Sequence, residues 1–167
     1  IMNLVDTLVG NLAATPPGIC LGSSIQFNAT GGTIYSWSPT TGLNDPNIAN
    51  PIASPTTTTS YQVTISDGFG CSRTIRRSVR VSNMSLSATT TPVLCNGGTN
   101  GAINLTVTGG LAPFSYSWTG PGGFTANTED ISFVAAGTYT VNVTDAVCTR
   151  SQSFTLSQPN ALAIALA

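Results

Sequence analysis

Apolar and polar residues alternate along two similar stretches of the chain, residues 60–66 and 138–144. A period of two places the apolar side chains on one face of a β-strand, so each stretch predicts a strand that is buried on one side. Both stretches then continue through an aspartate and a short turn to a cysteine. We interpret this repetition as two copies of one module. The expected inward positions are Tyr61, Val63 and Ile65 in the first copy and Tyr139, Val141 and Val143 in the second.

Shorter alternating runs surround these two stretches, and glycine, proline and asparagine separate them. No segment shows a convincing helical period. Short strands that recur every eight to twelve residues or so are typical of a β-sandwich. The sequence therefore predicts an all-β protein with two tandem sandwich domains. The expected strands cover residues 24–29, 33–38, 48–53, 60–66 and 72–81, and then 102–107, 114–118, 131–134, 138–145 and 151–156.

Each copy carries one tryptophan between two cysteines, Trp37 in the first and Trp118 in the second. The order Cys, Trp, Cys is typical of immunoglobulin-like sandwiches. We expect each tryptophan strand to face the strand of Tyr61 or Tyr139 across a common core, because these rings are the largest apolar groups available. An exposed platform for stacking sugars is the alternative. The alternating pattern around both tryptophans favours the core.

The four cysteines have nearly equal spacing in the two copies. Cys20 and Cys71 lie 51 residues apart, and Cys95 and Cys148 lie 53 apart. We therefore expect a Cys20–Cys71 and a Cys95–Cys148 disulfide, each stabilising its domain by roughly 4 kcal/mol. Four buried thiols are the alternative, and a zinc site is less favoured because the chain has no Cys-x-x-Cys and no histidine. Disulfides would indicate an oxidising compartment.

The repetition also sets the expected domain boundaries. Residues 1–13 would be a lead-in or the end of a preceding repeat. The first domain would cover residues 14–82 and the second 83–160. Residues 161–167 resemble the beginning of a further repeat or a linking strand. The chain thus looks like a piece of a longer array.

Charge is sparse and argues against several classes of partner. The chain has five basic and six acidic residues and a net charge of −1, so we expect no general attraction to nucleic acid or to an anionic membrane. The longest wholly apolar run, residues 161–167, is far too short for a membrane span. Without histidine or lysine, nucleophile–base and Schiff-base arrangements are not available, and we expect no enzyme.

Four of the five basic residues lie in one expected strand, at Arg73, Arg76, Arg77 and Arg80. They would either protect an exposed strand edge from pairing with another chain, which we favour, or bind an acidic polysaccharide through Arg73, Arg76 and Arg80. Arg77 shares its parity with apolar neighbours, so a bulge or a half-buried guanidinium is expected there.

Asp67 and Asp145 occupy equivalent places after the long strand of each copy. Aspartate in this position usually forms a turn by accepting hydrogen bonds from its own backbone, which is the interpretation we favour. A calcium site is the alternative, although the sequence has no Asp-x-Asp-x-Asp-Gly loop. We expect no cofactor.

Residues 95–110, 116–118 and 137–145 closely resemble the SprB-type repeat, which occurs in very long surface adhesins of gliding bacteria. Residues 35–37 and 53–67 resemble the related polycystic-kidney-disease (PKD)-like immunoglobulin domain. The PKD pattern normally places Asp-Phe-Gly-Asp after the tryptophan. This chain has Ser-Pro-Thr-Thr-Gly there instead.

The resemblance implies an exported, non-catalytic segment of a cell-surface or extracellular adhesin, sent out through the type IX secretion route of gliding bacteria. Such a segment would act as a stalk or filament and contact neighbouring repeats, identical subunits or surface polysaccharide. One alternative is a self-polymerising fibre subunit that adds residues 161–167 as a strand to a neighbour. The other is a carbohydrate-binding module.

Overall fold

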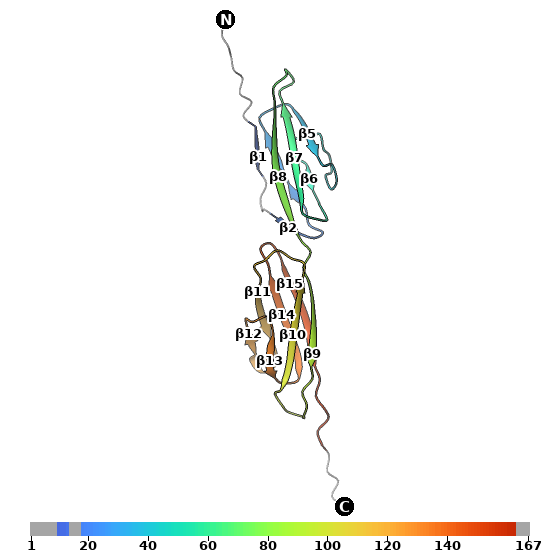
Figure 1. Ribbon diagram of the computed structural model, residues 1–167, viewed down its shortest axis with the longest axis vertical. Helices are drawn as coiled ribbons and strands as arrows, with labels where there is room; N and C mark the ends of the chain where they lie inside the picture. The colour runs from blue at the N-terminus through green and yellow to red at the C-terminus, as the bar shows by residue number, and fades with distance from the viewer. Residues whose placement is uncertain (1–9, 14–17, 163–167) are drawn as a thin grey trace, which may run out of the picture. The chain divides into compact units, whose positions relative to one another are not determined.

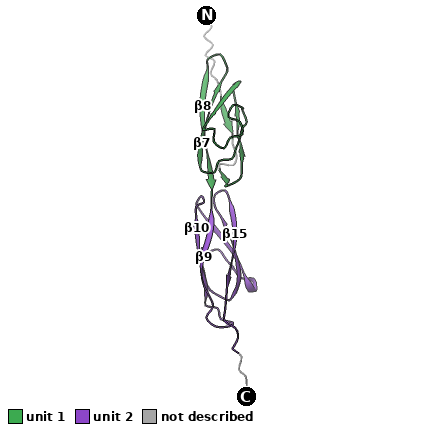
Figure 2. Cartoon of the chain, turned by 90° about the vertical axis from the view of Figure 1, so that its right-hand side faces the viewer, with its two compact units in different colours: residues 1–83 green, residues 84–167 purple. Residues whose placement is uncertain are grey.

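The computed structural model describes residues 10–13 and 18–162. It divides into two compact units, Ile1–Asn83 and Met84–Ala167 (Figure 2). Apart from one short 3-10 turn at Pro121–Gly123, the regular structure of the described residues is β-strand. This confirms the all-β class.

Unit 1 is a sandwich of two layers (Figure 1). One layer is a sheet with the strand order β2-β8-β7-β5, and the other contains the pairs β1-β4 and β3-β6. Phe27 lies between β3 and β4 and belongs to neither strand. The hydrogen bonding of the second layer continues through it, because its backbone nitrogen donates to the Pro51 carbonyl oxygen at 3.0 Å. The strands are β1 (Asn11–Ala13), β2 (Gly18–Cys20), β3 (Ile25–Gln26), β4 (Asn28–Thr30), β5 (Ile34–Ser38), β6 (Ile52–Ala53), β7 (Thr59–Ser66) and β8 (Ser72–Ser82).

Unit 2 is also a two-layer sandwich. Its sheets have the orders β12-β11-β14-β15 and β13-β10-β9, and all of these pairs are antiparallel. The strands are β9 (Ser85–Thr91), β10 (Gly101–Thr108), β11 (Ser115–Thr119), β12 (Thr125–Ala126), β13 (Ile131–Val134), β14 (Gly137–Thr144) and β15 (Thr149–Leu156).

The alternation in β7 and β14 places the predicted side chains in the two cores. All six inward positions are buried, and the polar residues between them point away from the core. The tryptophan strand is, however, the neighbour of the tyrosine strand in the same sheet rather than its partner across the core. Trp37 lies opposite Val63 on β7, and Trp118 lies opposite Val141 on β14.

The opposite layer of unit 1 contributes Phe27 to the centre of the core. Its ring stacks on Trp37 at 4.8 Å between centroids and meets Tyr61 edge-on at 5.5 Å. In unit 2, Phe124 meets Tyr139 edge-on at 5.3 Å. Sequence reasoning did not assign Phe27 this place because periodicity gives the face of a strand, not the sheet to which that strand belongs.

Two segments differ from expectation. Asn11–Ala13 is not a lead-in but pairs with β4 inside unit 1. Residues 85–91, where the sequence predicts no strand, form the full strand β9 alongside β10. Serine and threonine occupy most of β9, so hydrophobic alternation gives little sign of it. Residues 163–167 lie outside the described residues, so most of the expected linking strand at 161–167 has no structural account.

Each unit has two distinct ends, which we name for what they carry. The hairpin end carries the turn between the last two strands, residues 67–71 in unit 1 and 145–148 in unit 2. The exit end is where the last strand finishes, at Ser82 in unit 1 and at Leu156 in unit 2. Figure 1 shows β8 and β15 running from one end of their own unit to the other.

Candidate functional site

An aspartate organises the hairpin turn of each unit. In unit 1, the Oδ1 atom of Asp67 accepts hydrogen bonds from the backbone nitrogens of Phe69 at 2.7 Å and Cys71 at 3.2 Å. The bond from Phe69 is the main reason why the pKa of Asp67 lies below its ordinary value. These bonds are those of a turn-forming aspartate.

The corresponding aspartate of unit 2 is more deeply engaged. Oδ1 of Asp145 accepts from the backbone nitrogens of Val147 at 2.8 Å and Cys148 at 2.7 Å, and Oδ2 accepts from Leu111 at 2.9 Å. Asp145 is 7 % exposed, so these bonds satisfy a buried carboxylate. Its oxygens are therefore already committed to backbone donors.

The exit end of each unit carries a second turn that begins at a cysteine. The backbone nitrogen of Ser23 donates to Cys20 at 2.9 Å, and that of Gly98 donates to Cys95 at 3.0 Å. The third residue of each turn is a glycine with positive φ, 89° in the first turn and 75° in the second. A β-turn with positive φ at this position requires glycine. We call Cys20 and Cys95 the exit-turn cysteines.

The other two cysteines close the hairpin turns, and we call Cys71 and Cys148 the hairpin cysteines. In each turn the carbonyl oxygen of the cysteine accepts a hydrogen bond from the backbone nitrogen of the aspartate, at 3.3 Å in unit 1 and 2.8 Å in unit 2. The two modules therefore carry equivalent cysteines at equivalent ends.

The predicted disulfides Cys20–Cys71 and Cys95–Cys148 are both wrong. Cys20 and Cys148 are disulfide-bonded, whereas Cys71 and Cys95 carry thiols. Each predicted bridge would need one of the two cysteines that carry a thiol.

The length of the last strand explains why neither predicted bridge forms. Cys71 immediately precedes β8, and Cys20 lies beside Ser82 at the other end of that strand. Eleven residues of strand separate these two places by about 36 Å, whereas a disulfide needs Cα atoms within about 7 Å.

The same argument holds in unit 2. Cys148 immediately precedes β15, while the segment beside Cys95 reaches the far end of that strand. There the backbone nitrogen of Gly97 donates to the side-chain oxygen of Gln158 at 2.9 Å. Eight residues of strand separate the two cysteines by about 26 Å.

The arginines of β8 do not form one patch. Arg76 and Arg80 point away from the core, whereas Arg73 shares its parity with Ile75 on the opposite face of the strand. Arg77 is half-buried opposite Tyr61 in a regular register, so the half-buried guanidinium is observed and the bulge is not. Among the described strands, β8 has a partner on its second side at Gly18–Cys20 of β2, so most of its length is an edge.

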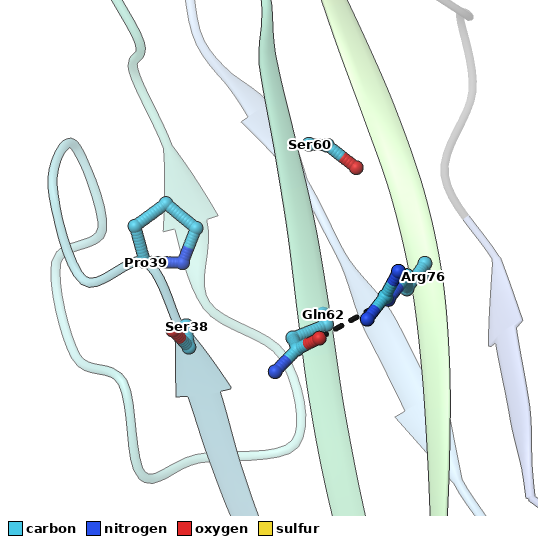
Figure 3. Close-up of a pocket in the computed structure, with 5 residues that line it drawn as sticks. All are labelled: Ser38, Pro39, Ser60, Gln62 and Arg76. Carbon is cyan, nitrogen blue, oxygen red and sulfur yellow. Dashed lines mark hydrogen bonds between the residues drawn. The ribbon is translucent and has the colours of Figure 1, made fainter.

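A shallow depression of about 320 Å³ lies on the outer face of the sheet of unit 1 beside Arg76. Figure 3 shows its lining side chains, with the Nε of Arg76 donating to the Oε1 of Gln62 at 3.1 Å. The guanidinium, the amide and the hydroxyl groups suit an anionic or polyhydroxylated ligand. The lining residues are Ser38, Pro39, Ser60, Gln62 and Arg76.

Sequence reasoning singled out Arg76 but not the residues around it. Gln62 faces Arg76 because β7 and β8 pair in a register that places these two residues opposite each other. Ser38 joins them because it lies opposite Gln62 on β5. Register is a property of the paired strands, so one strand's sequence does not reveal it.

The core aromatics are not available to a ligand. Trp37 is 2 % exposed and Trp118 is 0 % exposed. Their indole nitrogens donate to backbone carbonyl oxygens of Ile48 at 2.8 Å and Thr128 at 3.0 Å. A sugar-stacking platform needs an exposed ring face, so these residues serve the core.

Among the described residues, no group of three or more Cys, Asp or Glu side chains is arranged to hold a metal ion. Glu129 and Asp130 are neighbours, but the Oδ1 of Asp130 accepts a hydrogen bond from the backbone nitrogen of Leu105 at 2.8 Å. The described part of the chain also contains no helix long and apolar enough to span a membrane.

Comparison with known structures supports the immunoglobulin-like fold. An intimin fragment in complex with the intimin-binding domain of its receptor Tir has 15 % identity and a TM-score of 0.60, covering 90 % of this chain and 64 % of that one. The eight N-terminal immunoglobulin domains of the cell adhesion molecule DSCAM have 18 % identity and a TM-score of 0.57, covering 84 % of this chain and 23 % of that one. The I67–I69 fragment of titin has 14 % identity and a TM-score of 0.55, covering 90 % of this chain and 65 % of that one. This chain thus spans less than two thirds of each of these structures.

No curated protein sequence matches the chain. A family model does match part of unit 2, from residue 87 to residue 123, and that family is the SprB repeat. The matched segment begins in β9 and ends at the short 3-10 turn. Residues 87–123 therefore match the SprB repeat family, within a chain whose structure is that of tandem immunoglobulin-like sandwiches.

Proposed function

We propose that this chain is a load-bearing stalk segment of a cell-surface adhesin. The SprB-repeat match and the immunoglobulin-like fold support the adhesin class. The observation that supports load bearing is the way in which an early segment of each unit is fastened to the end of its last strand. That fastening decides how force along the chain enters each sandwich.

In unit 1, β2 runs parallel to the end of β8. Ile19 lies opposite Val81, and the backbone nitrogen of Leu21 adds a bond to the Ser82 carbonyl oxygen at 2.8 Å. Tension that reaches β2 and leaves through β8 pulls these strands in opposite directions along their length. Inter-strand hydrogen bonds cross between strands, so such tension loads several of them together rather than one after another.

Unit 2 has a related fastening. The backbone nitrogen of Val93, which follows β9, donates to the Ser157 carbonyl oxygen just after β15 at 2.9 Å. Val93 is 2 % exposed, so its side chain is packed as well as its backbone bonded. In both units, therefore, the segment near the exit-turn cysteine is bonded to the chain that leaves the unit.

The disulfide-bonded state of Cys20 and Cys148 supports an oxidising, extracellular setting. We include in the proposal that the parent protein is exported to the cell surface, by the type IX route that the SprB resemblance implies. Antibody against unit 2 is expected to label intact cells. Labelling that appears only after the cells are broken would contradict this part of the proposal.

The stalk role is tested by pulling the purified chain from both ends after treatment with a disulfide reductant. We expect two separate all-or-none unfolding events, each releasing on the order of 200 Å of chain, because each unit holds roughly 70 residues at about 3.5 Å per extended residue. Gradual extension at low force would show that the units do not bear load.

A second candidate function rests on the depression beside Arg76. We propose that it binds an acidic polysaccharide, with the guanidinium contacting a carboxylate and the Ser60 and Gln62 side chains contacting sugar hydroxyls. Alginate is a suitable probe. Arg76→Gln is expected to weaken its binding, whereas Arg73→Gln, on the opposite face of the same strand, is the matched control. Equal loss in both variants would reduce the effect to general charge attraction.

A further inference from the structure

Phe133 has a backbone conformation that its side chain disfavours. Among the described residues it is the one residue other than glycine with a positive φ, which is 58°. It belongs to β13, at the edge of the sheet β13-β10-β9. Consecutive residues of β10 lie opposite Val134 and Ser132, so Phe133, between these two, has no partner on β10. Phe133 is therefore the extra residue of a β-bulge, and glycine is the residue preferred in a bulge with positive φ.

Neither the core nor the bulge explains why this residue is a phenylalanine. The side chain of Phe133 is 85 % exposed, so it adds little to the core of unit 2. A bulge protects an edge strand by twisting it away from other chains, and glycine would allow this without the strain of a bulky residue at positive φ. Strained residues cluster at ligand contacts. We therefore looked for a ligand that the exposed ring fits.

The side chains around this ring are polar and uncharged. The burial pattern of β13 is buried, exposed, exposed, buried, so Ser132 and Phe133 both lie on the outer face of the sheet. The outward residues that follow in the register are Ala102 and Asn104 of β10 and Thr91 and Thr89 of β9. Opposite residues of neighbouring strands have Cβ atoms about 5 Å apart, so one oligosaccharide can reach the ring and several of these groups together.

We propose that Phe133 stacks on the sugar rings of a neutral, β-linked polysaccharide, while the Asn104 amide and the Thr91 hydroxyl bind sugar hydroxyls. The C–H groups of a β-linked glucose or mannose unit form an apolar face that suits an aromatic ring. Amide and hydroxyl groups both donate and accept hydrogen bonds, as sugar hydroxyls do. This inference depends neither on the stalk role nor on the depression beside Arg76.

The charges near Phe133 favour a neutral ligand over an acidic one. The ionisable residues nearest to it along the chain are Glu129 and Asp130, and both are acidic and exposed. Their charges would repel a polysaccharide that carries carboxylates. The depression beside Arg76 has the opposite preference, because its ionisable lining residue is a cation. The charge of the ligand therefore distinguishes the two sites.

The same surroundings favour a sugar over a protein. Protein contacts place an aromatic anchor at the centre of a larger apolar area from which water is excluded. Phe133 is instead a single ring beside Ser132, with threonine and asparagine as the next outward side chains apart from Ala102. A polar setting around one ring suits a ligand that is itself mostly hydroxyl groups.

Affinity gel electrophoresis with hydroxyethylcellulose and with konjac glucomannan tests the proposal, because both polymers are neutral and β-linked. At least one of them is expected to retard the natural chain. Phe133→Gly should weaken that binding at least several-fold, and Phe133→Trp should retain it. Phe69→Gly removes another exposed phenylalanine, in unit 1, and is the matched control that should bind like the natural chain. Any binding of alginate should be the same in all four proteins.

Thermal unfolding provides a second readout, which a structural role of the ring would change. Glycine relieves the strain at positive φ and removes almost no buried surface. The melting temperature of unit 2 in Phe133→Gly is therefore expected to equal or exceed that of the natural chain. A fall of several degrees would show that the ring supports the fold rather than a ligand.

Three further results would overturn the proposal. Failure of both neutral polymers to retard the natural chain would show that there is no such site. Equal retardation of the natural chain and Phe133→Gly, or equal loss in Phe133→Gly and Phe69→Gly, would show that this ring is not the contact. Self-association of the natural chain in sedimentation, absent in Phe133→Gly, would show that the ring serves a contact between proteins.

Discussion

The backbone nitrogen of Cys148 donates a hydrogen bond to the Oδ1 atom of Asp145 at 2.7 Å. The same carboxylate accepts bonds from two further backbone nitrogens, at Val147 and at Leu111. One buried side chain therefore fixes the hairpin cysteine and also ties the segment that follows β10 to this turn. The equivalent Asp67 binds two backbone nitrogens of its own turn.

Replacing Asp145 by asparagine should destabilise unit 2 by about 1–3 kcal/mol, because an amide group would face the Leu111 N–H and leave a buried donor without an acceptor. Thermal unfolding of unit 2 is the measurement. Glu129→Gln removes one exposed negative charge from the same unit and is the control. Equal melting temperatures for the Asp145 and Glu129 variants would contradict this role.

The lowered pKa of Asp67 predicts that the stability of unit 1 depends on pH. Its pKa in the folded chain is lowered, mainly by the hydrogen bond from the Phe69 nitrogen, so it lies below the value of about 3.9 expected in the unfolded chain. The carboxylate's stabilising contribution is therefore complete above the unfolded-state pKa and is lost as the pH falls through the folded-state pKa. The difference in melting temperature between the natural chain and Asp67→Asn should shrink on acidification from about pH 7 to about pH 2. A difference that stays constant over this range would show that the carboxylate has no such role.

Gly120 should not tolerate a side chain. A Cβ atom at this position would lie 2.4 Å from Cδ1 of Tyr139, whose buried ring packs against Phe124. Gly120→Ala is expected to cost about 1–3 kcal/mol through overpacking of the core of unit 2. Thr119→Ala, at the neighbouring exposed position, provides the comparison. If the two alanine variants unfold at the same temperature, the ring of Tyr139 does not lie against Gly120.

Calcium should have no effect on either unit. The carboxylates of Asp67 and Asp145, the two aspartates at equivalent turns, are occupied by backbone donors, and we propose that the fold needs no metal. Titration calorimetry with calcium should show no binding heat, and the melting temperature should be the same in calcium and in chelator. A calcium-dependent rise in melting temperature of several degrees would contradict this proposal.

Hydrophobic alternation predicts the central strands well because it reflects a local requirement. β7 and β14 each alternate between core and surface along their length, and their sequences show it directly. β9 pairs along its whole length with β10, but its residues are mostly serine and threonine. Its sequence therefore shows no clear hydrophobic alternation, and the strand was not predicted. The tryptophans are recognisable as core residues for the same local reason.

The cysteine prediction failed for an instructive reason. Equal spacing in two copies shows that Cys20 corresponds to Cys95 and that Cys71 corresponds to Cys148. It does not show which cysteines bond, because any repeated pair of positions has equal spacing. The missing information was that a complete strand, β8 or β15, separates the two cysteines of each module. The arginine patch failed similarly, since strand parity places Arg73 and Arg76 on opposite faces.

The measurement that tests load bearing most directly compares two variants of Leu21 in the pulling experiment on the reduced chain. Leu21→Pro removes the N–H that donates to Ser82, at a turn position where proline is favoured, whereas Leu21→Ala shortens a side chain that is already 53 % exposed and keeps the N–H. The account predicts that proline lowers the unfolding force of unit 1, that alanine leaves it unchanged, and that neither alters unit 2. Equal unfolding forces for the proline and alanine variants would show that the fastening of β2 to β8 does not carry the load.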